Sequence, residues 1–184
     1  MLHALLALAL SSTTPASGIT KVVIIGRAGS LDVNGRSGAT EIRATGKPES
    51  PDAKLVATRS GSQLTIEAVT PDDKALDFEV VVPAGVAVKI NDGSGELNVK
   101  NVGELDVTDG SGSIDIDGVT GNVRVSDGSG SIDVKNLSGS VTITDDGSGS
   151  VNVTDVRGDF TVLKKGSGHV EHARIGGRVS LPQK

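Results

Sequence analysis

The tripeptide Gly-Ser-Gly occurs five times in the second half of this 184-residue chain, and no other feature constrains the fold as strongly. Its first glycines are Gly93, Gly110, Gly128, Gly147 and Gly166, which gives intervals of 17, 18, 19 and 19 residues. A fixed period of this length is typical of folds in which each repeat buries its apolar face only against its neighbours. The sequence therefore indicates a stacked β architecture, and it says much less about activity.

Each tripeptide is followed by alternating apolar and polar residues, the period-2 pattern of a half-buried strand. A Gly-containing turn and a second short strand complete each repeat. Laid in register, the first strands give three columns: Leu97, Ile114, Ile132, Val151 and Val170; then Val99, Ile116, Val134, Val153 and His172; then Val102, Val119, Leu137, Val156 and Ile175. We expect side chains one repeat apart to touch, so that Ile114 and Ile132 lie in adjoining parallel strands.

From this pattern we predict an all-β fold: a parallel β-helix, or β-solenoid, with two short strands per 17–19-residue coil and an irregular N-terminal β cap. The outward column Lys100, Asp117, Lys135 and Thr154 supports the same register, because opposite charges become neighbours. The extra residue of the 19-residue repeats, at Asp145-Asp146 and Lys164-Lys165, is expected to fall in a turn. An antiparallel meander is the alternative, since short Gly-containing turns also close hairpins.

The rest of the chain divides into a leader and a less regular β region. Residues 1–16 resemble a secretory signal peptide, with an apolar stretch and small residues suited to cleavage after Ala16. The alternatives are a mis-assigned start and an apolar N-terminal strand. Residues 17–184 are expected to form one domain, in which residues 17–90 supply irregular strands and 91–184 the repeats. The expected strands of the irregular part are 21–26, 30–34, 40–45, 54–58, 63–68, 76–82 and 86–90, separated by Gly, Pro or Ser breaks.

Composition excludes several classes of function. The formal charge of −5 argues against nucleic acid, which requires a basic footprint. Two Phe and no Trp or Tyr leave no platform for stacking bases or sugar rings. Disulfides are ruled out because there is no Cys. No pair of carboxylates is gathered in a loop long enough to build a cleft, so we expect no enzyme and no catalytic residue.

The stretch from Asp77 to Val99, DFEVVVPAGVAVKINDGSGELNV, followed by the reiterated Gly-Ser-Gly units, resembles the bacterial putative-adhesin, β-strand-repeat domain family. The most specific part is Val80-Val81-Val82-Pro83-Ala84-Gly85-Val86 running into Asp92-Gly93-Ser94-Gly95. The resemblance implies an exported or envelope-associated bacterial protein with a β-helical body. It carries over no catalytic residue.

Two clusters raise the possibility of a metal site. Asp92, Asp109, Asp127 and Asp146 each precede a Gly-Ser-Gly, so stacked repeats would line carboxylates along one corner, and oxygen ligands suit calcium. Asp115 and Asp133 form a second adjacent pair. The competing interpretation is that Asp and Gly simply suit tight turns. His169-Val170-Glu171-His172 also contains ligand types, but on a strand His172 faces away from His169 and Glu171.

The predicted function is therefore a non-catalytic, exported, adhesin-like structural or interaction module of the bacterial cell envelope, located in the periplasm or secreted. Its partner would be an envelope component or another protein, not nucleic acid, and it would have no transmembrane span. The alternative is a calcium-binding, β-roll-like module that uses the repeated Asp-Gly turns. Beyond possible calcium, no cofactor is expected, and the sequence leaves the oligomeric state open.

Overall fold

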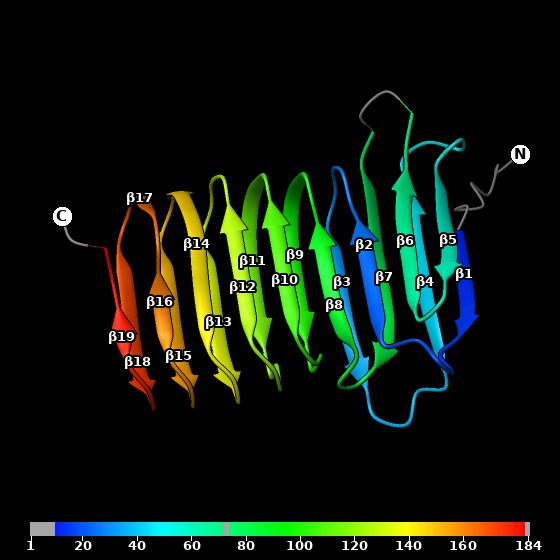
Figure 1. Cartoon of the computed structure of the whole chain (residues 1–184). Coiled ribbons are helices and arrows are strands. Elements are labelled where there is room, and N and C mark those ends of the chain that lie inside the picture. The colour runs from blue at the N-terminus through cyan, green and yellow to red at the C-terminus, as the bar shows by residue number, and fades with distance from the viewer. Residues whose placement is uncertain (1–9, 72–73, 183–184) are drawn as a thin grey trace, which may run out of the picture.

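The computed structural model describes residues 10–71 and 74–182 of the chain, and Figure 1 shows the arrangement of their strands. Those residues form nineteen β-strands in two sheets, and none of them belongs to a helix. The strands alternate buried and exposed residues along most of their length, as the period-2 sequence pattern requires. Each sheet therefore has one apolar face, and the two apolar faces pack against each other.

The nine-stranded sheet contains the first strand of every Gly-Ser-Gly repeat. Its spatial order is β1 (Leu10–Pro15), β4 (Glu41–Pro48), β7 (Leu76–Pro83), β3 (Leu31–Arg36), β9 (Ser94–Lys100), β11 (Ser111–Asp117), β13 (Ile132–Leu137), β15 (Val151–Val156) and β18 (Val170–Ile175).

The ten-stranded sheet contains the second strand of every repeat. Its order is β19 (Val179–Ser180), β16 (Phe160–Val162), β14 (Val141–Ser148), β12 (Val123–Asp127), β10 (Leu105–Asp109), β8 (Ala87–Asn91), β2 (Lys21–Ile25), β6 (Gln63–Val69) and β5 (Lys54–Ser60). The short strand β17 (Lys165–Ser167) also pairs with β14.

The prediction of a parallel β-helix, or β-solenoid, is wrong. Both sheets are mixed, because β4 pairs antiparallel with β1 and β7, and β5 pairs antiparallel with β6. The result is a sandwich of two large sheets around one core. The prediction failed because it treated the N-terminal strands as an irregular cap on a solenoid, whereas they extend both sheets and pair partly antiparallel. There a two-residue turn at Gly61, with φ of 59°, closes a hairpin between β5 and β6.

Within the repeats the predicted register is confirmed. Ile114 lies opposite Ile132 in adjoining parallel strands, and Asp117 pairs with both Lys100 and Lys135. The second strands also pair in parallel, with Leu105 opposite Val123. A meander of antiparallel strands therefore does not describe this half of the chain.

The extra residue of the longer repeats is absorbed differently from the prediction. Between β12 and β14 the pairing runs from Val125–Ile143 to Ser126–Asp145, so Thr144 is an unpaired residue inside the strand. This is a β-bulge rather than a longer turn. The Thr144 hydroxyl donates a hydrogen bond of 3.0 Å to the Val125 carbonyl, which satisfies a polar group at the irregularity.

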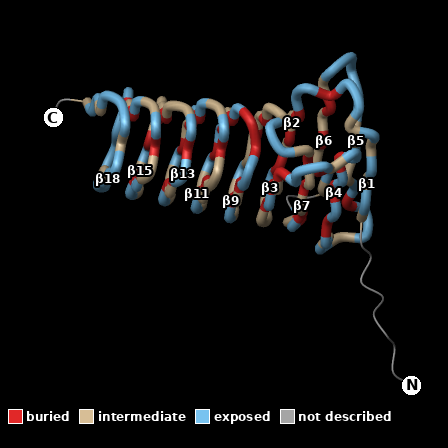
Figure 2. Tube along the Cα trace, turned by 90° about the horizontal axis from the view of Figure 1, so that it is seen from below, coloured by how far each residue is buried: buried red, intermediate tan, exposed pale blue. Residues whose placement is uncertain are grey.

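The core is almost entirely aliphatic. Buried side chains run along the inside of the body, and Figure 2 shows that burial declines toward β18 at the C-terminal end. Phe160 is the largest of the fully buried side chains. His172 continues the second apolar column, opposite Val153, and its ring meets Phe160 edge-on at 6.0 Å between centroids. A core one side chain deep explains why the chain needs so few aromatic residues.

All seven strands expected between residues 21 and 90 are present, although their ends differ by up to three residues. Sequence reasoning missed β1 and β17. Strand β1 lies inside the predicted signal peptide: residues 1–9 fall outside the described part of the chain, whereas Leu10–Pro15 pair with β4. Cleavage after Ala16 stays a prediction.

Candidate functional site

Four aspartates line one corner of the sandwich. Asp109 ends β10, Asp127 ends β12 and Asp146 lies in β14, and the strand register places them beside one another. Asp92, which follows β8, joins the row because its N–H donates to the Thr108 carbonyl of β10 at 2.9 Å. We call these four residues the aspartate column. Neighbouring strands lie about 4.7–4.9 Å apart, so each carboxylate has another next to it.

The Gly-Ser-Gly tripeptides make this corner possible. The second glycine of each repeat has φ between 128° and 144°, a region that residues with side chains rarely adopt. A side chain there would also overlap a backbone carbonyl oxygen of the preceding repeat. At the following turn Ser129 donates its N–H to Asp127 at 3.2 Å. Close stacking of the repeats therefore requires glycine in the tripeptide. The same stacking holds the preceding aspartate at the corner.

Three members of the column are shielded from water, whereas Asp92 is partly exposed. Asp109, Asp127 and Asp146 are 5%, 2% and 0% exposed. Several of its carboxylate oxygens have no hydrogen-bond partner among the described residues: Oδ2 of Asp92, both oxygens of Asp109, Oδ2 of Asp127 and both of Asp146. Buried carboxylates without partners are rare, because desolvation disfavours the charged form.

Burial raises the pKa of all four groups, and nearby backbone N–H groups partly offset the rise of the pKa at Asp92, Asp109 and Asp127. Desolvation is the largest cause in every case, and it brings the pKa of Asp92 and of Asp127 to about 6. The charge of Asp109 adds to the rise of the pKa at both positions. The pKa of Asp109 and that of Asp146 are also raised by burial, and Lys165 partly offsets the rise at Asp146.

The two ends of the column differ. At one end, Gly26 follows β2, and the Asp92 carboxylate occupies the space where a side chain on Gly26 would begin. At the other end, Lys165 of β17 lies opposite Asp146 in the register. The column therefore holds four carboxylates in a row, with a glycine before the first and a lysine after the last.

The predicted calcium ligands are thus brought together, but as a row. Calcium takes six to eight oxygens around one point. In the part of the chain that the structure describes, no group of three or more His, Asp or Glu side chains is arranged to hold a metal ion. Calcium binding at Asp92, Asp109, Asp127 and Asp146 stays a prediction.

In the C-terminal cluster, Val170, Glu171 and His172 lie in β18, and His169 directly precedes this strand. His172 lies opposite Val153 but is exposed, and its ring contacts Phe160, whereas Glu171 lies opposite Asn152 in the neighbouring strand. His172 therefore touches the end of the core without being buried in it.

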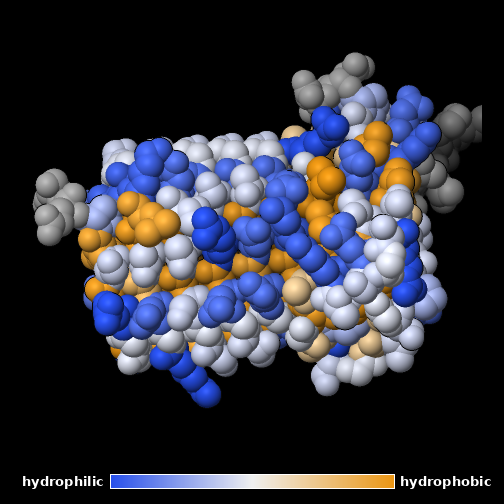
Figure 3. All heavy atoms as spheres, in the orientation of Figure 1, coloured by the Kyte–Doolittle hydropathy of each residue, from blue (hydrophilic) through white to orange (hydrophobic). Residues whose placement is uncertain are grey.

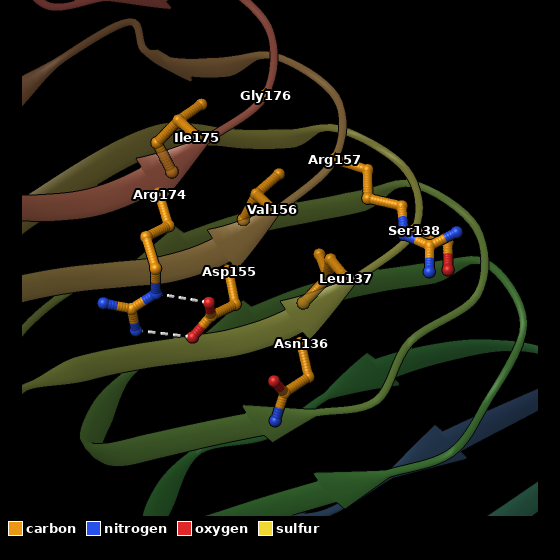
Figure 4. Close-up of a pocket in the computed structure, with 9 residues that line it drawn as sticks. All are labelled: Asn136, Leu137, Ser138, Asp155, Val156, Arg157, Arg174, Ile175 and Gly176. Atoms are coloured by element: carbon orange, nitrogen blue, oxygen red, sulfur yellow. Dashed lines mark hydrogen bonds and ion pairs between the residues drawn. The ribbon is translucent and has the colours of Figure 1, made fainter.

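The opposite corner carries a polar column that sequence reasoning missed. In successive repeats the residue before the third apolar column adopts positive φ: Asn101, Gly118, Asn136, Asp155 and Arg174. Asn and Gly tolerate this conformation well, so their recurrence at this position was the available signal. Arg174 donates two hydrogen bonds, of 2.5 and 2.7 Å, to the Asp155 carboxylate, as Figure 4 shows.

An open groove of about 610 Å³ lies along this corner. Its lining combines the polar side chains of Asn136, Asp155 and Arg174 with the apolar Leu137, Val156 and Ile175 (Figure 4). Arg157 extends along it beside Ser138. The polar lining of the groove could contact a polar group. However, the two charged side chains best placed for such a contact, Asp155 and Arg174, are already paired with each other.

The outer face of the nine-stranded sheet carries regular polar rows. One row runs Glu79, Asp32, Asn98, Asp115, Asp133, Asn152 and Glu171 across the sheet. The predicted Asp115–Asp133 pair is part of it, and the Asn152 amide donates to Asp133 at 3.0 Å. The neighbouring row includes Lys100, Asp117 and Lys135, with an ion pair of 3.8 Å between the last two. The parallel register thus displays like groups at a fixed spacing.

The face drawn in Figure 3 has the same layered character: a narrow band of hydrophobic residues runs along the body between hydrophilic rows. Exposed large hydrophobic residues among the described ones are few and scattered, namely Val56, Val69, Leu163 and Leu181. Scattered residues of this kind do not make an apolar docking patch. The described part of the chain contains no helix long and apolar enough to cross a membrane.

Comparison with known proteins finds similarity in structure alone. No family model matches the chain, and neither does any curated protein. A solved structure of a putative cell adhesion protein from Clostridium sporogenes has a TM-score of 0.52 at 11% identity, and the match covers 95% of this chain and 99% of that one. A putative adhesin from Bacteroides fragilis gives 0.36 at 11% identity over 95% and 97%. A putative adhesin from Parabacteroides merdae gives 0.31 at 12% over 95% and 96%. This chain therefore shares its fold with a bacterial protein described as a putative cell adhesion protein.

Proposed function

We propose that this protein is a non-catalytic interaction module, adhesin-like, that works at the bacterial cell envelope or outside the cell. The observation that carries the proposal is the outer face of the nine-stranded sheet. Its polar rows are fixed by backbone register, so the face is a rigid and repetitive surface rather than a cleft. A surface of this kind suits recognition of an extended or repetitive partner, because its contacts are ordered before binding and lose little entropy.

Two further observations support the proposal. The fold is that of the Clostridium sporogenes protein, which is described as a putative cell adhesion protein. The segment from Asp77 to Val99, with its resemblance to the bacterial putative-adhesin family, forms the junction between the N-terminal strands and the repeats. Export through a leader within residues 1–16 belongs to the same proposal and would place the module where an envelope partner is available.

A binding assay with two matched double variants tests this proposal. Asp115→Ser with Asp133→Ser changes adjacent residues on the outer face of the nine-stranded sheet. Asp106→Ser with Arg124→Ser changes adjacent outward residues on the ten-stranded sheet. We expect the wild type to bind isolated cell envelopes of the producing bacterium, the first variant to bind at least tenfold more weakly, and the second to bind like the wild type.

The circular dichroism spectra of both variants should match that of the wild type, so that weaker binding reports on the surface. If the wild type fails to bind envelopes and recovers no envelope protein in pull-downs, the interaction role is wrong. Equal loss of binding in the two variants would instead show that the nine-stranded sheet is not the recognition face.

A further inference from the structure

The buried aspartates of the column do more than a tight turn requires. Such a turn uses one carboxylate oxygen to accept a backbone N–H, as Asp127 does from Ser129 at 3.2 Å. The chain places four carboxylates in one row, at Asp92, Asp109, Asp127 and Asp146, and the last three of them are buried. Six of their eight oxygens have no partner among the described residues. Such an arrangement is costly when every group is ionised, and it requires a cation or protons.

The row geometry favours protons. A proton bridges two carboxyl oxygens and needs only neighbouring pairs, and every member of the column has a neighbour at the strand spacing. A calcium ion would need six or more oxygens at one point, and a buried row offers two carboxylates at a time. Lys165 faces only the last member, Asp146, so its charge cannot neutralise the other three carboxylates.

We propose that the aspartate column takes up and shares protons, and that it works as a pH-sensitive lock on this corner of the sandwich. In mildly acidic surroundings the protonated carboxyls donate hydrogen bonds to their neighbours and tie successive repeats together. At neutral pH the carboxylates are ionised, repel one another along the row and weaken the corner. This inference does not depend on the adhesin-like function, because it concerns stability alone.

Whether the stability of the fold rises or falls with pH depends on whether the folded or the unfolded state binds more protons. The folded protein keeps protons on Asp92 and Asp127 up to pH near 6, because their folded-state pKa is about 6. The unfolded chain releases them near the ordinary value of 3.8. Stability therefore falls as the pH rises through the interval between these two values, and the contribution is lost above pH 6.

Other charged groups near the column do not reverse this expectation. Lys165 lowers the pKa of Asp146, and Asp145 raises it. Asp145 is itself paired with Lys164 at 2.7 Å. At the opposite end Gly26 contributes no charge. Asp127 has a carboxylate on each side, and the charges of Asp109 and Asp146 both add to the rise of its pKa, so it is the member to substitute.

Thermal unfolding of the full chain between pH 4.5 and 8, with Asp127→Asn and a control variant, tests the proposal. Asn has the shape of Asp, carries no charge and donates hydrogen bonds to its neighbours. We expect the wild-type Tm to fall with rising pH through the interval that ends near pH 6. Asp127→Asn should have a higher Tm than the wild type at pH 7.5 and a flatter pH dependence. The control Asp115→Asn, on the outer sheet face, should keep the wild-type pH dependence.

A second measurement on the wild type keeps the proposal testable even if Asp127→Asn does not fold. Carboxyl carbon NMR of aspartate-labelled protein should show signals that titrate near pH 6. The proposal is overturned if the wild-type Tm does not change over this pH range, or if both variants flatten the profile equally. It is also overturned if millimolar calcium, but not EDTA-treated buffer, restores the neutral-pH Tm of the wild type, which would identify the column as a calcium site.

Discussion

A side chain on Gly112 would overlap the backbone carbonyl oxygen of Gly95, its neighbour one repeat earlier in strand β9. Gly112 also has φ of 135°. We therefore expect Gly112→Ala to combine backbone strain with a clash against an atom that cannot move alone. The predicted cost is about 3 kcal/mol or more in the free energy of unfolding, measured by urea titration.

Gly38→Ala is the matched control for this substitution. Gly38 also has positive φ, 73°, but open space surrounds the position of its missing side chain. It should cost only the conformational penalty of about 1–2 kcal/mol. Equal losses at Gly38 and Gly112 would show that close stacking of the repeats is not what requires glycine.

Truncation of Ile132 tests the packing between repeats. Its side chain is fully buried and lies beside Ile114 and Val151 in the adjoining strands. Ile132→Ala should lower the free energy of unfolding by about 2–5 kcal/mol, since it removes buried methyl groups and leaves a cavity. Val56→Ala, at a position 41% exposed, should change it by about 0.5 kcal/mol or less. Similar effects at both positions would contradict the assigned core.

The Asp155–Arg174 pair gives a prediction with the opposite pH sign. The hydrogen bonds from Arg174 hold the pKa of Asp155 below its usual range. A lowered folded-state pKa contributes stability above the ordinary value of 3.8, and that contribution is lost as the pH falls through the folded-state pKa. In Arg174→Gln the pKa of Asp155 should rise toward its ordinary value, as followed by carboxyl NMR.

High salt should produce part of the same rise in the wild type, because both side chains are exposed and their interaction is screened. An unchanged Asp155 titration in Arg174→Gln would mean that the ion pair does not persist in solution.

Export can be checked at the N-terminus of the protein recovered outside the cytoplasm. If cleavage follows Ala16, the intact mass will correspond to a chain that begins at Ser17. That product lacks β1 and exposes the edge of β4, which β1 otherwise covers through a six-residue antiparallel register. Recovery of a chain that retains Leu10–Pro15 would place the cleavage site earlier and make β1 part of the mature sandwich.

Local residue patterns determined most of the strands and the register of the repeats. Period-2 alternation is a local signal, so the strands from Lys21 to Ile90 and the pairing of Ile114 with Ile132 could be predicted. The recurrence of aspartate before each Gly-Ser-Gly likewise predicted that the aspartate column would line one corner. These inferences succeeded because each depends on residues a single repeat apart.

The mixed sheets and the electrostatics of the corner were decided by tertiary structure. Whether β4 pairs parallel or antiparallel depends on strands far away in the sequence, because β7 lies between β4 and β3. Local alternation is the same for both directions of pairing, so it could not reveal the sandwich. The aspartates could be placed in a row from sequence, but their burial and unpartnered oxygens depend on how the two sheets close over them. The sequence identifies which residues carry charge, but the extent to which each charge is desolvated depends on tertiary packing.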